Sequence, residues 1–133
     1  MTALQALLGF TAWTLLVMFL YVNWRVIEVL RGKSAASWTR GAAIEQPAII
    51  KRMEHAHTNC LENLPVFAAI VLAAAAMNKS AVADAYGAYI LYARIAQSLV
   101  HIIGVNHWLV LVRATLFGAQ LVMFVLMLWG LLH

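Results

Sequence analysis

Residues 52–62 carry polar side chains at helical spacing in a chain that is otherwise very apolar. Arg52, His55, Asn59 and Glu62 recur every three or four residues, so an α-helix places all of them on one face. Arginine binds anionic groups through paired hydrogen bonds, and histidine exchanges protons near neutral pH. This face predicts a helix that turns a polar, ligand-binding side toward other parts of the protein.

Two later segments repeat the pattern. Residues 81–103 contain Arg94, Gln97 and His101 at one-turn spacing, and residues 108–132 contain Arg113, Phe117 and Gln120. A charged side chain in the hydrocarbon of a membrane costs about 2.5–3.5 kcal/mol on insertion scales, and such residues normally mark a functional site. The three segments therefore predict a shared polar cavity.

The composition is that of a membrane protein. Of 133 residues, 65% are hydrophobic and 11% are charged, whereas soluble domains carry about 25% charged residues. The single Cys60 excludes an intramolecular disulfide framework. The net charge of +4 does not indicate nucleic-acid binding, because five of the nine Lys and Arg residues lie between Arg31 and Arg52, beside a membrane segment.

The elements that must position these residues are four membrane-spanning helices. A span needs about 20 mainly apolar residues, and the sequence predicts spans near 3–31, 48–77, 81–103 and 108–132. The last two connections are very short, which favours antiparallel neighbours. We therefore expect an all-α, integral membrane four-helix bundle that forms a single domain over residues 1–133. Pro65 is expected to kink the second helix or to free a carbonyl there.

The distribution of basic residues predicts the orientation. The first connection and its flanks hold the basic residues Arg31, Lys33, Arg40, Lys51 and Arg52. By the positive-inside rule, loops one and three are cytoplasmic and both termini lie on the opposite side. All four polar helix ends then lie in the cytoplasmic leaflet. Arg31, Lys33, Arg40 and Lys51 can alternatively serve only to set the topology beside anionic lipid headgroups, and Arg52 can snorkel to the interface.

Structural pairings are the alternatives to a functional site. Arg94 can form an ion pair with Glu62, and Asn59 and Glu62 can bond to each other. His55 and His57 are two residues apart and cannot chelate one metal ion from a regular helix. No metal site is expected. Cys60 points off the polar face, which argues against a catalytic thiol.

The chain resembles the MAPEG family, the membrane-associated proteins in eicosanoid and glutathione metabolism, and within it a microbial-type member. The family has a signature in its second helix of the form R-A-x-x-N-x-x-E-N-x-P. The stretch HAHTNCLENLP matches it at Ala56, Asn59, Glu62, Asn63 and Pro65. Further matches follow in order along essentially the whole chain: Arg31 closing helix one, Arg94, Gln97 and His101 in helix three, and Arg113 opening helix four.

The resemblance implies a homotrimer with three intersubunit sites near the cytoplasmic side. Glutathione would be the co-substrate, and its thiolate would attack a lipophilic electrophile that enters from the bilayer. Arg113 would stabilise the thiolate. The residues implied for glutathione binding are Arg31, Arg52, His55, Asn59, Glu62, Arg94, Gln97 and His101. The activity implied is that of a glutathione transferase or peroxidase, with membrane lipid and a hydrophobic small molecule as further partners.

The chain departs from the family pattern at His55, where arginine is usual. In the eicosanoid-synthesising branch, Gln97 and His101 are typically His and Tyr, and Ala114 is often Ser. We therefore do not expect a prostaglandin or leukotriene synthase. A non-catalytic lipid-binding or scaffold member is one alternative function. A cytochrome b-like haem bundle with His55 or His57 and His101 as ligands is another.

Overall fold

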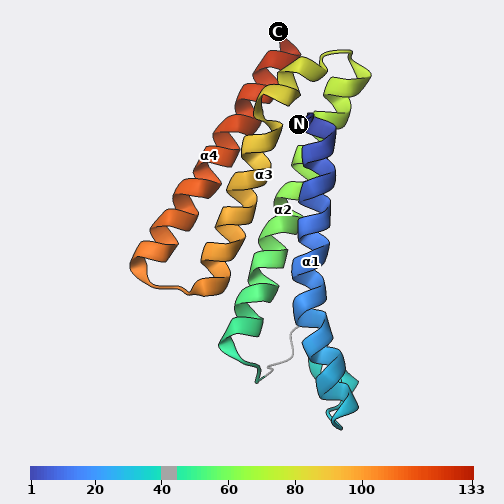
Figure 1. The fold of residues 1–133 in the computed structure, drawn as a ribbon, viewed down its shortest axis with the longest axis vertical. Helices are drawn as coiled ribbons and strands as arrows, with labels where there is room; N and C mark the ends of the chain where they lie inside the picture. Colours follow the sequence, from blue (N-terminus) through green and yellow to red (C-terminus); the bar gives the residue numbers. More distant parts are fainter. Residues whose placement is uncertain (40–44) are drawn as a thin grey trace.

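The structure is a computed structural model that describes residues 1–39 and 45–133. Its helices are α1 (Ala3–Leu30), α2 (Ala48–Ala76), α3 (Ser80–Ile103) and α4 (His107–Leu132), with a short 3-10 helix η1 (Ala35–Trp38) after α1. Figure 1 shows them as a bundle of long, roughly antiparallel helices. Each long helix begins and ends within one residue of the span expected from the sequence. Arg40 lies outside the described residues.

Local signals define where the helices begin and end. Thr2 forms a capping box with Gln5 at the start of α1, and the Asn106 side chain accepts from the Leu109 N–H at the start of α4. Asn78 has a φ of 56° directly after α2, the left-handed conformation that commonly ends a helix. Pro65 lies inside α2, which is continuous from Ala48 to Ala76. Because proline has no N–H, the helix lacks one backbone bond there.

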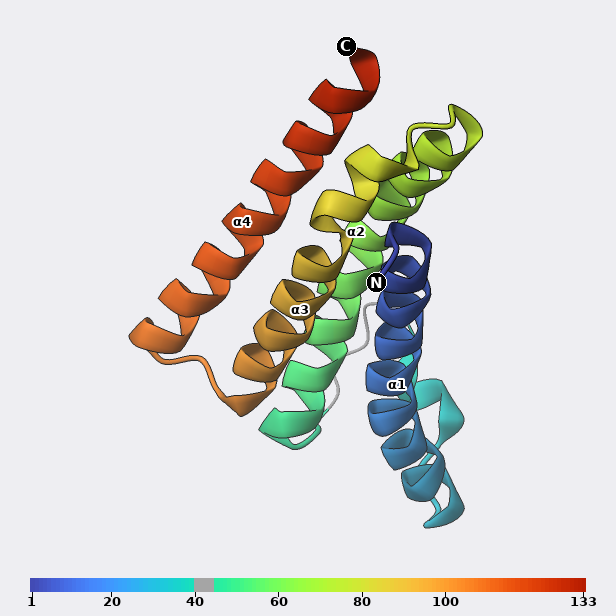
Figure 2. The same cartoon turned by 45° about the horizontal axis from the view of Figure 1, so that its top comes forward.

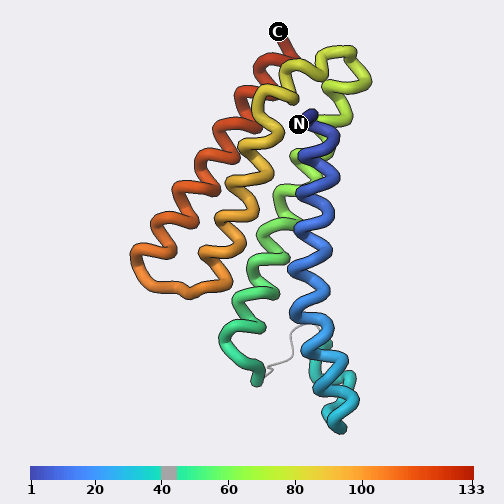
Figure 3. The backbone as a smooth tube through the Cα atoms, in the orientation of Figure 1, coloured from blue at the N-terminus to red at the C-terminus, as the bar shows by residue number. Residues whose placement is uncertain are grey.

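The helix α3 is the centre of the bundle. It packs against α1, α2 and α4, whereas α4 packs mainly on α3 and touches α2 over a shorter stretch. The tube in Figure 3 follows the same order, and the turned view in Figure 2 shows α4 on the far side of α3 from α1. Polar side chains on α3 are therefore placed to bond with three other helices.

The apolar core is tied together by aromatic rings. Phe10 of α1 lies 5.7 Å from Phe67 of α2, and Phe67 lies 6.0 Å from Phe124 of α4, measured between ring centroids. Tilted aromatic pairs at these separations are favourable beyond the area that they bury. At the end of the bundle where α1 begins, a Cβ at Gly87 would lie 2.9 Å from the backbone of Ala3. Glycine therefore permits the close approach of α1 to α3.

By length and apolarity, three helices can cross a membrane: α1, α2 and α4. Within the described part of the chain, α3 falls short of this criterion, although the sequence predicted four spans. The reason is that Arg94, Gln97 and His101 lower the mean hydropathy of α3, although all three side chains are buried. Its outward residues include Tyr89, Leu99 and Ile103. An average over all residues of α3 therefore understates how apolar its outer surface is.

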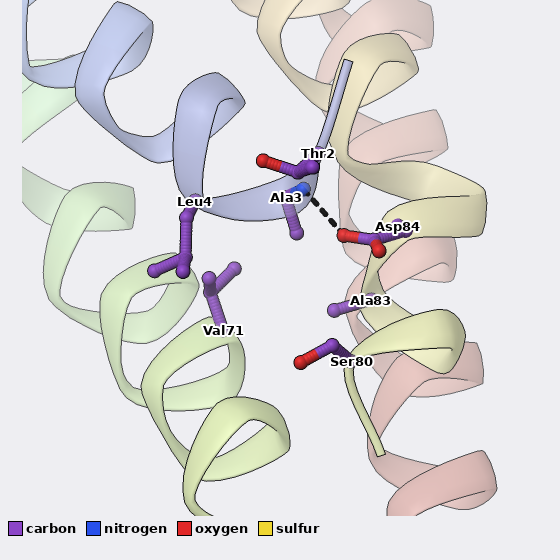
Figure 4. Close-up of a pocket in the computed structure, with 7 residues that line it drawn as sticks. All are labelled: Thr2, Ala3, Leu4, Val71, Ser80, Ala83 and Asp84. Atoms are coloured by element: carbon purple, nitrogen blue, oxygen red, sulfur yellow. Dashed lines mark hydrogen bonds between the residues drawn. The ribbon is translucent and has the colours of Figure 1, made fainter. Parts of the chain in front are cut away.

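Two charged side chains bind helix ends at the end of the bundle where α1 begins and α4 finishes. The Asp84 carboxylate accepts a hydrogen bond from the Ala3 N–H at 2.6 Å, and the Lys79 ammonium donates to the Leu131 carbonyl at 3.0 Å. Figure 4 shows the first contact, with the N-terminus of α1 directed at Asp84 of α3. An anion at a helix N-terminus and a cation at a helix C-terminus both offset the helix dipole. These charges therefore cap α1 and α4.

The cavity beside Asp84 has the dimensions of a packing gap. Its volume is about 140 Å³, and Thr2, Leu4, Val71 and Ser80 line it together with Asp84. Binding sites for small organic ligands usually measure about 300–1,000 Å³. We therefore assign to this end of the bundle a role in stabilising the fold and not in binding a ligand.

Asp84→Ala is expected to lower the free energy of unfolding by about 1–2 kcal/mol, because it leaves the first N–H groups of α1 without a charged acceptor. Thermal unfolding in detergent measures the change, with Ser80→Ala in the same cavity as a control. Asp84→Asn keeps a hydrogen-bond acceptor and should lose less. Equal melting temperatures for Asp84→Ala and Ser80→Ala would show that the cap does not stabilise the bundle.

Candidate functional site

Two adjoining cavities lie between α2 and α4, and residues of α3 also line them. The first has a volume of about 350 Å³ and is lined by Asn59, Glu62, Gln97, Val110, Arg113, Ala114 and Phe117. The second is also about 350 Å³ and is lined by His55, Thr58, Asn59, His101 and Arg113. Because Asn59 and Arg113 line both, we treat the two cavities as one groove and call it the α2–α4 groove. Each cavity alone falls within the volume range of small-molecule sites.

The groove contains most of the polar face that the sequence placed on α2. His55, Asn59 and Glu62 all line it. Arg52, on the same face, lies just beyond the lining and donates from Nε to the Ile102 carbonyl at 2.8 Å. That carbonyl belongs to the last turn of α3, where backbone acceptors lack partners within the helix. Arg52 thus fastens the start of α2 to the end of α3.

A chain of side-chain hydrogen bonds joins Arg94 and Gln120 to Gln97, which lines the groove. Arg94 is completely buried and donates from Nε to Gln120 Oε1 at 3.1 Å. Gln120 in turn donates from Nε2 to Gln97 Oε1 at 2.8 Å. Gln97 Oε1 thus accepts from α4, and the amide N–H groups of Gln97, which form no bond to the described residues, can donate to a ligand in the groove. The network therefore fixes the direction in which Gln97 can hydrogen-bond.

The guanidinium of Arg94 is only partly satisfied. Within residues 1–39 and 45–133, neither of its Nη atoms has a hydrogen-bond partner. The guanidinium carbon lies 5.5 Å from the centre of the Phe10 ring. Buried donors without acceptors are costly. Arg94 therefore has capacity for acceptors beyond those that residues 1–39 and 45–133 supply, such as water or a ligand.

The two structural pairings considered from the sequence are both wrong. The ion pairs among the described residues are Arg25 with Glu54 at 3.0 Å and Arg31 with Glu28 at 3.5 Å, so Arg94 forms none with Glu62. The reason is that the Arg94 side chain is completely buried, whereas Glu62 is exposed.

Asn59 bonds across to α3 and not along its own helix. Its Nδ2 lies 3.2 Å from His101 Nδ1, and no bond to Glu62 is formed. Glu62 is exposed and has no hydrogen bond or ion pair within the described chain. Its carboxylate is therefore available to a ligand or to another protein chain.

His55 and His101 are brought together from different helices. Their ring centroids lie 6.1 Å apart at an interplanar angle of 45°. His101 is buried, whereas His55 is exposed. His57 faces α1 instead, with its Nδ1 3.2 Å from the Thr14 carbonyl. Of the two haem-ligand pairs considered from the sequence, only His55 with His101 is therefore close.

Arg113 is the cation of the groove. It projects from α4 into both cavities and is partly buried. Its guanidinium makes no hydrogen bond or ion pair to the part of the chain that the structure describes. Because Glu62 lines only the first cavity, the groove offers positive charge at its centre and negative charge to one side. This arrangement can hold a molecule that carries both an anionic and a cationic group.

Arg31 does not lie in the groove of its own chain. It caps the C-terminus of α1, is exposed, and pairs with Glu28 in the preceding turn. The long α1 helix carries it past the end of the bundle core, as Figure 1 shows for the lower end of α1. Its expected contact with a ligand would require the groove of another chain.

The role of Gln120 does not follow from the sequence pattern. Its spacing places it on the Arg113 face of α4, but only the structure shows that it joins Arg94 to Gln97. The available signal was a buried amide in an otherwise apolar stretch, LFGAQLVMF. An amide that must be satisfied inside a membrane bundle has few partners, and Arg94 and Gln97 are the polar groups at its depth.

Comparison with known proteins gives a family match that covers all four helices. The MAPEG family model matches residues 3–133. A search of curated proteins finds no significant match. The match includes every residue that lines the α2–α4 groove.

Proposed function

The chain belongs to the MAPEG family, and on that premise we propose that it is a membrane-bound, glutathione-dependent transferase or peroxidase that acts on lipophilic electrophiles. The family match and the apolar helices make it an integral membrane protein. The reaction and the co-substrate are the proposal.

The observation that carries the proposal is the distribution of charge in the α2–α4 groove. Glutathione has two carboxylates, an amino group, two amides and a thiol. Arg113 can bind an anionic group, Glu62 can bind the amino group, and Asn59 and Gln97 can bond to amides. The hydrocarbon chains of a lipid carry no group that could bond to Glu62, Asn59 or Gln97.

Arg113 is the residue to which we assign activation of the thiol. The thiolate is the reactive form of a thiol, and a nearby guanidinium favours it by stabilising the negative charge. Arg113 lines both cavities and has no partner within the described chain, so its charge is directed at the groove. The protein then needs no nucleophile of its own. It positions the thiolate against an electrophile that enters from the bilayer.

Three observations support a homotrimer with sites between subunits. Glu62 is exposed, the Nη atoms of Arg94 lack partners within the described chain, and Arg31 lies outside the groove of its own chain. A neighbouring subunit can supply Arg31 to the groove and cover its open side. The excess of basic residues around the first connection supports a cytoplasmic position for loops one and three, with both termini opposite.

Glutathione is expected to stabilise the purified protein against thermal unfolding in detergent. At 100 times its dissociation constant, a ligand that binds only the folded state adds about 2.7 kcal/mol. An equimolar mixture of glutamate, cysteine and glycine is the control for non-specific effects, and Glu62→Gln should reduce the shift. An unchanged melting temperature at millimolar glutathione would contradict the proposal.

A non-catalytic lipid-binding member is the second candidate. The favouring observation is Ala114, which lines the groove next to Arg113 and offers no hydroxyl beside the position assigned to the thiolate. Lipid that co-purifies in the groove, with no turnover of any thiol acceptor, would support this function. Turnover that disappears in Arg113→Ala would exclude it.

A further inference from the structure

The two histidines of the groove differ in what their nitrogen atoms can do. Asn59 Nδ2 lies 3.2 Å from His101 Nδ1. An amide nitrogen only donates hydrogen bonds, so His101 Nδ1 is the acceptor and its proton is on Nε2. With Nε2 already protonated, His101 cannot take up a proton there. It can only donate a hydrogen bond from that atom.

The surroundings of His101 disfavour a second proton on its ring. His101 is buried, and the Arg113 cation lines the same cavity. Glu62 is the acid that lines the groove, and it lies in the cavity that does not include His101. A second proton on His101 would also break its bond to Asn59. His101 is thus a fixed hydrogen-bond donor.

His55 lacks the hydrogen bond that fixes the tautomer of His101. It is exposed, and the structure gives it no hydrogen bond to the described residues. It lines the same cavity as His101 and Arg113, and its ring centroid is 6.1 Å from that of His101. An exposed imidazole without a hydrogen-bond partner among the described residues has a ring nitrogen that is open to accept a proton.

We propose that His55 accepts the proton of the glutathione thiol while His101 donates a hydrogen bond to the thiolate. This inference rests on the proposed function. The S–H bond breaks, the proton passes to the free imidazole nitrogen of His55, and the electron pair stays on sulfur. The thiolate is then held by the Arg113 guanidinium and by the Nε2–H of His101. The histidine at position 55 thus gives this chain a proton acceptor that an arginine could not provide.

Counting the protons released when glutathione binds tests the proposal. The whole protein in detergent is titrated with glutathione by calorimetry at neutral pH, in buffers of different ionisation enthalpy. The thiolate formed is measured by ultraviolet absorption. In the unmodified protein the thiolate forms without net proton release, because His55 retains the proton. In His55→Gln each thiolate formed releases one proton to the buffer.

His107→Gln is the matched control, since His107 is an exposed histidine at the start of α4 that lies outside the groove lining. It should behave as the unmodified protein does. Equal proton release per thiolate from the unmodified protein and from His55→Gln would overturn the role of His55. A lack of glutathione binding in all variants would instead overturn the proposed function, and with it this inference.

A second pair of variants tests His101. His101→Gln keeps an N–H donor and should retain most of the thiolate, whereas His101→Phe should reduce the thiolate fraction about tenfold or more, because a hydrogen bond to a charged group is lost. Equal thiolate fractions in His101→Gln and His101→Phe would overturn the donor role of His101.

Discussion

Arg113→Ala is expected to lower kcat/KM for conjugation of glutathione with a small electrophile by about 10²–10³-fold, the usual loss when one preorganised group that stabilises developing charge is removed. Arg113 lies at the junction of both cavities and makes no ion pair in the described chain. Its charge is therefore not weakened by an internal partner. Steady-state conjugation rates in detergent or in liposomes measure the effect.

The loss should appear mainly in the reaction step and only weakly in binding. Glu62, Asn59 and Gln97 remain in the groove after the substitution, so glutathione affinity should fall far less than the rate. Arg113→Lys keeps the charge without the planar fork and should be intermediate. Lys51→Gln, which removes an exposed cation outside the groove, is the control. A conjugation rate for Arg113→Ala close to that of Lys51→Gln would refute the assignment of Arg113.

Gln120→Leu is expected to lower the free energy of unfolding by about 3–5 kcal/mol, because it leaves a buried guanidinium without its acceptor. Arg94 is completely buried, and the Gln120 oxygen, 3.1 Å from its Nε, is its side-chain acceptor in the described chain. The substitution also removes the donor to Gln97. Unfolding in mixed micelles by denaturant or heat measures the loss.

Matched variants separate this network from a general effect of leucine on α4. Thr115→Leu places the same side chain at an exposed position of the same helix and should change the stability by less than about 0.5 kcal/mol. The double variant Arg94→Met with Gln120→Leu removes the buried charge together with its acceptor and should recover much of the loss. If Gln120→Leu unfolds like Thr115→Leu, the network does not stabilise the bundle.

The sequence by itself determined the architecture and which polar residues share a helix face. Lengths of apolar sequence, caps such as Asn106 and the turn at Asn78 are local properties, and the helix ends follow from them. The face of His55, Asn59 and Glu62 follows from helical periodicity alone, and these residues line the groove. The family signature in HAHTNCLENLP is also a property of neighbouring residues, and it led to the family that the match over residues 3–133 shows.

Only the tertiary structure decided which polar groups meet. Periodicity gives the direction of a side chain around its own helix, but not the rotation, depth or crossing of the neighbouring helix. For that reason the sequence left an ion pair of Arg94 with Glu62 open as an alternative, whereas the bundle gives the Arg94 Nε to Gln120. It placed Arg31 with the polar face, whereas the length of α1 carries Arg31 beyond its own groove. The hydrogen bond from Asn59 to His101, which fixes the proton on that histidine, likewise depends on how α2 and α3 pack.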